Sequence, residues 1–71
     1  MADFEGLCKR IIDCNGNISC KDVLDYGYSM ENFIRLSQPN VKPERLVKNA
    51  REALLARGLH YKEGNVNEKV N

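Results

Sequence analysis

Glycine and proline interrupt the apolar pattern of this chain at short intervals. Asn15-Gly16, Gly27, Pro39 and Gly58 each follow a stretch in which apolar residues recur every three or four positions. Glycine accepts the positive φ that ends a helix, and proline has no amide hydrogen with which to continue one. The chain can therefore fold only into short helices joined by tight turns. At 71 residues it has room for a single core.

The helix boundaries can be predicted from capping residues. Asp3, Ser19 and Ser29 are suited to begin helices, Asp22 can complete a capping box with Ser19, and Pro43 suits a first helical turn. The sequence predicts an all-α bundle of about four helices. Their expected ranges are 4–14, 20–26, 30–38 and 43–57. Residues 1–61 are expected to form the domain, and the polar residues 62–71 a flexible tail.

Each predicted helix has an apolar stripe that we expect to face the core. The predicted inward residues are Phe4, Leu7, Cys8, Ile11 and Ile12; Val23 and Leu24; Met30, Phe33, Ile34 and Leu36; and Leu46, Val47, Ala50, Ala53 and Leu54. Leu55 is the exception, because it projects among the charged residues of the last helix.

The sequence contains no recognisable catalytic motif. It has no glycine-rich phosphate loop and no paired acids, and His60 has no nucleophile or orienting carboxylate close in sequence. Cys8, Cys14 and Cys20 are six residues apart, so on a helix they would point in different directions, and only His60 could add a fourth metal ligand. A non-enzymatic binding protein with free thiols and no cofactor or metal is predicted.

The sequence also gives a prediction of the cellular location. The N-terminal residues 1–5 do not resemble a signal peptide, and no apolar run approaches the length that a membrane span needs. We therefore expect a cytoplasmic protein, or a nuclear one in a eukaryote, that is neither secreted nor embedded in a membrane.

Residues 19–38 combine a short helix, a glycine turn and a second helix. Gly27 falls at the turn between Tyr26 and Tyr28, and Phe33 and Leu36 occupy inward positions of the second helix. This arrangement resembles the helix-turn-helix class of DNA-binding domains. The resemblance implies that the second helix enters the major groove. The base-reading residues would then be Ser29, Glu31, Asn32, Arg35 and Gln38.

Local charge gives this hypothesis a second element. The net charge is only +1, but residues 42–62 hold six Lys and Arg against two Glu. Arg45, Lys48 and Arg51 lie opposite the apolar stripe of the last helix and could contact phosphates, or could simply form a solvated face. The first hypothesis is a regulator or accessory factor that binds duplex DNA as a homodimer.

A protein-protein interaction module, such as an adaptor or inhibitor, is the alternative. Leu55 together with Leu59 and Tyr61 could form an exposed patch for a protein partner, or could receive the C-terminal segment of the chain itself. The corner of Tyr26 and Tyr28 offers another contact. The two hypotheses therefore use different surfaces of the same small bundle.

Overall fold

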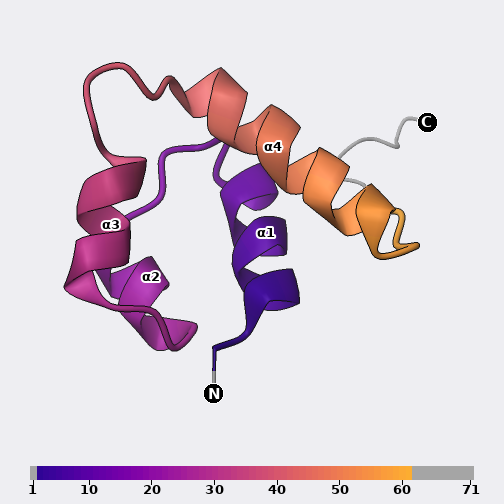
Figure 1. Ribbon diagram of the computed structural model, residues 1–71, viewed down its shortest axis with the longest axis horizontal. Helices are drawn as coiled ribbons and strands as arrows, with labels where there is room; N and C mark the ends of the chain where they lie inside the picture. The colour runs from indigo at the N-terminus through magenta and orange to yellow at the C-terminus, as the bar shows by residue number, and fades with distance from the viewer. Residues whose placement is uncertain (1, 62–71) are drawn as a thin grey trace.

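The computed structural model describes residues 2–61 and contains four helices and no strand in that range. They are α1 (Phe4–Asp13), α2 (Cys20–Asp25), α3 (Met30–Leu36) and α4 (Pro43–Ala56). α1 packs chiefly against α4, and α2 packs against α3 beside them (Figure 1). The predicted all-α class is confirmed, whereas the predicted tail, 62–71, lies outside the described residues.

The predicted helix starts are confirmed in their hydrogen bonds. Asp3 accepts from the amide of Gly6 at 2.9 Å, and Ser19 and Ser29 each begin a capping box. The partner of Ser19 is Asp22, as predicted, and Ser29 pairs in the same way with Asn32. These contacts satisfy amide groups that have no partner within the helix.

Three helices end in the same manner, with a residue of positive φ and two backbone hydrogen bonds that close the last turn. After α4, the amide of Gly58 donates to Leu55 and that of Leu59 donates to Leu54. The same pair of bonds follows α1 at Asn15-Gly16 and α2 at Gly27. The glycine turns predicted from the sequence are therefore the actual helix stops.

α3 ends two residues earlier than predicted. The prediction ran to Gln38, but the helix stops at Leu36. Pro39 disfavours helical backbone at the residue before it, so Gln38 leaves the helix. The side chains of Ser37 and Gln38 then donate to the carbonyl of Ile34, at 3.2 and 3.1 Å.

The core lies between α1, α4 and the inner side of α2. Its buried members are Leu7, Cys8, Ile11, Ile12, Val23, Leu46, Ala50 and Leu54. Ile12, Val23 and Leu54 are the largest side chains that are fully enclosed. The predicted inward stripes of α1 and α4 are largely confirmed, although Phe4 lies at the edge of the stripe and is 36% exposed.

The prediction of burial was wrong for three residues: Leu24, Met30 and Ile34 are 47%, 52% and 52% exposed. On α2 the inward position is taken by Val23, and the next residue is rotated by about 100°. On α3 the partly buried residues Phe33 and Leu36 face the bundle instead. Within residues 2–61 no helix packs over the outer side of α2 and α3 (Figure 1).

Asp22 connects the start of α2 to α1 through its carboxylate. Its carboxylate accepts from the Ser19 amide and lies 3.3 Å from Nε of Arg10 on α1. Partial burial acts to raise the pKa of Asp22, but the hydrogen bonds from Ser19 and the Arg10 contact outweigh it and hold that pKa below its ordinary value. The folded state therefore favours the charged form.

Asp22→Asn should keep the capping box, as Asn32 does in α3, while removing the charge. Because the folded pKa is lowered, the stability that this charge contributes is present above the ordinary pKa of about 4 and is lost as pH falls through the folded value. Wild type should be the more stable at neutral pH, and the difference should shrink as the pH falls below about 4, in urea denaturation at each pH. A difference that stays constant with pH would contradict this.

Candidate functional site

The polar residues predicted to read DNA bases lie on or near α3, and two of them are engaged in its cap. The Ser29 hydroxyl accepts from the Asn32 amide at 3.4 Å and donates to the Asn32 side-chain oxygen at 2.8 Å. That oxygen also accepts from the Ser29 amide at 3.0 Å. Base contacts by Ser29 or by the Asn32 oxygen would therefore compete with the start of the helix.

The other three predicted readers are exposed. Arg35 lies 3.2 Å from Glu31, with both side chains 74% exposed, and Gln38 donates to a backbone carbonyl at the end of α3. An ion pair so open to water is worth about 0–1 kcal/mol, so Arg35 can leave Glu31 at little cost. The face of α3 that reaches solvent thus carries one acid, one base and the apolar Met30 and Ile34.

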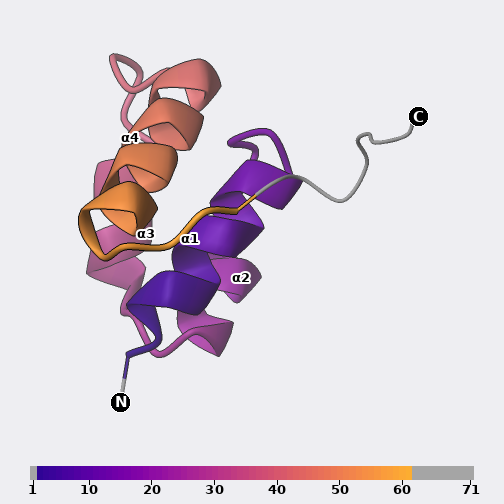
Figure 2. The same cartoon turned by 90° about the vertical axis from the view of Figure 1, so that its right-hand side faces the viewer.

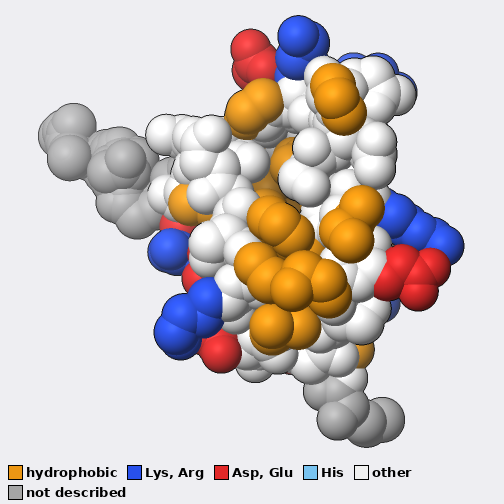
Figure 3. All heavy atoms as spheres, turned by 90° about the vertical axis from the view of Figure 1, so that its left-hand side faces the viewer, with side chains coloured by type: hydrophobic (Ala, Val, Ile, Leu, Met, Phe, Trp, Pro, Cys, Tyr) orange, Lys and Arg blue, Asp and Glu red, His pale blue; other side chains and the backbone are white. Residues whose placement is uncertain are grey.

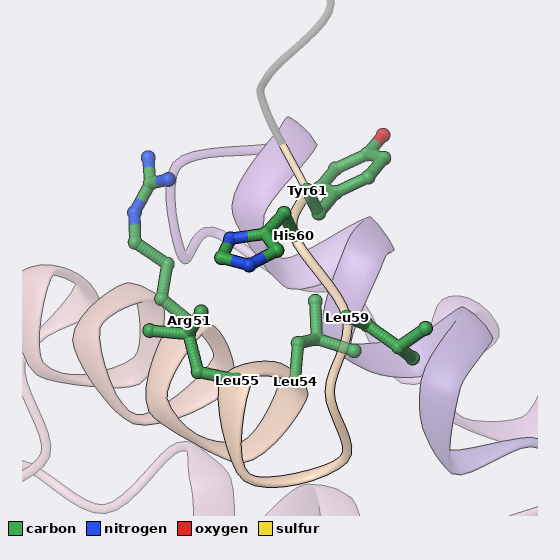
Figure 4. Close-up of a pocket in the computed structure, with 6 residues that line it drawn as sticks. All are labelled: Arg51, Leu54, Leu55, Leu59, His60 and Tyr61. Atoms are coloured by element: carbon green, nitrogen blue, oxygen red, sulfur yellow. The ribbon is translucent and has the colours of Figure 1, made fainter.

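The predicted basic ridge of α4 divides between two hollows. Arg45 and Lys48 line one hollow together with Lys42, and Glu44, Asn49 and Glu52 complete it. Arg51 lies at a second hollow of about 220 Å³ with Leu55 and His60 (Figure 4). The structure therefore gathers Lys42, Arg45 and Lys48, and places Arg51 beside an apolar neighbour.

The predicted partner-contact residues Leu55, Leu59 and Tyr61 line the same hollow as Arg51, but they differ in exposure. Leu55 is 53% exposed, as predicted, but Leu59 and Tyr61 are partly buried against the core. The segment after α4 turns back across α1 (Figure 2), where the Tyr61 hydroxyl donates to the Asp13 carboxylate at 2.7–2.8 Å. Nζ of Lys9 lies 5.6 Å from the centre of the Tyr61 ring. Leu59 and Tyr61 thus pack back on the bundle, and Leu55 stays exposed beside them.

Another apolar surface lies on the outer side of α2 and α3. We call it the α2–α3 patch, and its members are Cys20, Leu24, Met30 and Ile34. The sulfur of Cys20 lies 3.3 Å from that of Met30, which joins the two helices across this face. Figure 3 shows hydrophobic side chains gathered here, with charged side chains on either side. The sequence prediction missed this surface because it assigned three of its members to the core.

Opposite charges border the α2–α3 patch on both helices. On α2, Lys21 and Asp25 form an ion pair at 2.8 Å, and on α3, Arg35 pairs with Glu31. At this border each helix therefore offers one cation and one anion. The border carries no net charge, so it does not repel a surface of either sign.

The cysteines do not form a metal site in the part of the chain that the structure describes. Cys8 is buried, Cys14 and Cys20 are partly buried, and all three are free thiols. Burial raises the pKa of the Cys8 thiol, although Arg57 acts in the opposite direction. No group of three or more His, Cys, Asp or Glu is placed to hold a metal ion among residues 2–61.

Comparisons with protein-family models, curated proteins and solved structures find no match to this chain. Within residues 2–61, none of the helices is long and apolar enough to cross a membrane. The α2–α3 patch and the basic hollow of α4 are the two surface features that bear on function.

Proposed function

We propose that this protein is a non-enzymatic protein-protein interaction module. The observation that carries the proposal is the α2–α3 patch, where Leu24, Met30 and Ile34 are each about half exposed on one face. Single exposed apolar residues are ordinary on protein surfaces, but contiguous ones typically mark contact sites. None of these side chains is needed to fill the core of the isolated chain.

The occupant that we propose for the α2–α3 patch is a second copy of the chain. A two-fold contact places the same surface on both sides, and the mixed charges of α2 and α3 allow each cation to meet an anion of the other copy. A chain of this length buries little apolar surface alone, so a second copy would add to a small core. The predicted cytoplasmic or nuclear location stays a prediction.

Ile34→Asp should prevent dimerisation. A charge in the centre of an apolar contact loses its hydration without gaining a partner, so we expect the dimer dissociation constant to rise at least about tenfold. The matched control is Leu55→Asp, because Leu55 is equally exposed but lies on another surface. Sedimentation velocity of the full chain across a concentration series measures the effect, with circular dichroism to verify folding.

Two results would contradict the dimer. One is a wild-type chain that remains monomeric at about 1 mM, which corresponds to a binding free energy weaker than about 4 kcal/mol. The other is dissociation by Leu55→Asp with no effect of Ile34→Asp, which would move the contact to α4.

A second candidate function is duplex-DNA binding by a helix-turn-helix regulator or accessory factor. The specific observation in its favour is the hollow in which Lys42, Arg45 and Lys48 lie together. Contacts with phosphates would make the affinity for mixed duplex DNA fall steeply between two salt concentrations. A titration that shows no binding at the lower salt concentration would exclude this candidate and leave the interaction module untouched.

A further inference from the structure

A second apolar surface, distinct from the α2–α3 patch, is a groove between α1, α3 and α4. It consists of two adjoining open hollows of about 190 and 220 Å³, which share Phe4, Leu7 and Leu36. The hollow of about 190 Å³ is completed by Cys8, Ile11, Leu46, Asn49, Ala50 and Ala53. Tyr28, Asn32 and Arg35 complete the other hollow. Most of its lining is therefore apolar.

The groove exists because α4 presents small residues to it. Ala50 and Ala53 stand where larger side chains would close the space between α1 and α4. An engineered cavity of about 150 Å³ holds a benzene molecule, so each hollow has the size to take one leucine or phenylalanine side chain. Two such side chains are the usual anchors of a helix that binds in a groove.

Two cations lie at the groove, Arg35 in its lining and Arg57 beside Phe4. Arg35 is the only charged residue among the described ones that line it. The guanidinium of Arg57 lies 4.5 Å from the centre of the Phe4 ring, which both hollows share. Glu31 accompanies Arg35, but no acid accompanies Phe4 in the groove lining.

The basic surface continues beyond the groove. Asn49 belongs both to the groove and to the hollow that holds Lys42, Arg45 and Lys48. Glu44 and Glu52 in that hollow leave it with a net charge of +1. An acidic binding partner therefore meets a small net positive charge along this side of α4.

We propose that the groove binds an acidic amphipathic helix of another protein. Two apolar side chains of that helix, three or four residues apart, fill the hollows, and its flanking carboxylates face Arg35 and Arg57. A second copy of this chain does not supply such a helix through α4, whose exposed side is itself rich in Arg and Lys. The proposal extends the interaction function to a second surface, and it does not depend on dimerisation.

Ala53→Leu should close the groove and weaken binding. The probe is a fluorescein-labelled helical peptide of about 16 residues, with leucine on one face and glutamate on both flanks. We expect the peptide to bind the wild-type chain, and its dissociation constant to rise at least about tenfold for Ala53→Leu. Ala56→Leu is the matched control, because it makes the same change at an exposed position of α4 that does not line the groove.

The charge of the partner is tested separately. A peptide with lysine in place of each glutamate should bind at least about tenfold more weakly, and Arg35→Gln should weaken only the glutamate peptide. Arg35→Gln also tests the groove if Ala53→Leu does not fold, since Arg35 is an exposed residue. The affinity of Ile34→Asp for the peptide should equal that of wild type.

Four results would overturn this inference: no binding of the glutamate peptide by the wild-type chain, equal affinity of Ala53→Leu and wild type, equal loss of affinity in Ala56→Leu, or equal affinity for the two peptides. Loss of peptide binding in Ile34→Asp would instead assign the peptide to the α2–α3 patch. A monomeric wild type that binds the glutamate peptide would reject the dimer and keep the groove.

Discussion

Gly16→Ala is expected to lower the free energy of unfolding by about 2–5 kcal/mol. Gly16 is buried and has φ +83°, a conformation that costs an L-residue about 1–2 kcal/mol. A Cβ at this position would also lie 2.7 Å from the carbonyl carbon and Cα of Pro43, the first residue of α4. Because those atoms belong to the backbone, the clash adds about 1–3 kcal/mol. The sum approaches the whole stability expected of so short a chain.

Gly58→Ala separates the two contributions. Gly58 also has a positive φ, of +78°, but a Cβ there would meet no atom within 4 Å. Alanine restricts the unfolded chain by the same amount at both positions, so that effect cancels in the comparison. Urea denaturation should therefore place Gly16→Ala about 1–3 kcal/mol below Gly58→Ala. Equal stabilities of the two variants would show that a Cβ at position 16 does not clash with the backbone of α4.

The fold could be predicted in most of its local features because local chemistry determines them. Helix starts and stops depend on hydrogen bonds and backbone angles that involve only sequence neighbours. Examples are the capping box of Ser19 and Asp22, the turn at Gly27, and Pro43 in the first turn of α4. The same reasoning was wrong at the end of α3, where the effect of Pro39 on the preceding residue shortens the helix.

The candidate sites could not be predicted to the same extent. Met30 and Ile34 are four residues apart, and this spacing indicates that they share a face of α3. It does not indicate whether another helix covers that face, and in the structure none of the described helices does. Leu59 and Tyr61 pack back near α1, where Tyr61 bonds Asp13, 48 residues earlier in the sequence. A local sequence pattern cannot predict a contact between residues so far apart.

The substitutions Ile12→Ala and Ile34→Ala should differ strongly in their effect on the free energy of unfolding. Ile12 is fully enclosed between the helices, so Ile12→Ala should cost about 2–5 kcal/mol through lost burial and the cavity that remains. Ile34 is 52% exposed on the α2–α3 patch, and Ile34→Ala should change the free energy of unfolding of the monomer by less than about 0.5 kcal/mol. Urea denaturation at low protein concentration, where the chain is monomeric, measures both.

The two substitutions should have the opposite order of effect on dimerisation: Ile34→Ala should weaken the dimer, and Ile12→Ala should not. Ile34→Ala should weaken the dimer although it leaves the monomer intact, because its side chain contributes apolar area only when a second copy covers it. A variant of Ile12 that still folds should dimerise normally once its folded fraction is taken into account. If Ile34→Ala destabilises the monomer as strongly as Ile12→Ala does, the isoleucine belongs to the core and the α2–α3 patch is not an interaction surface.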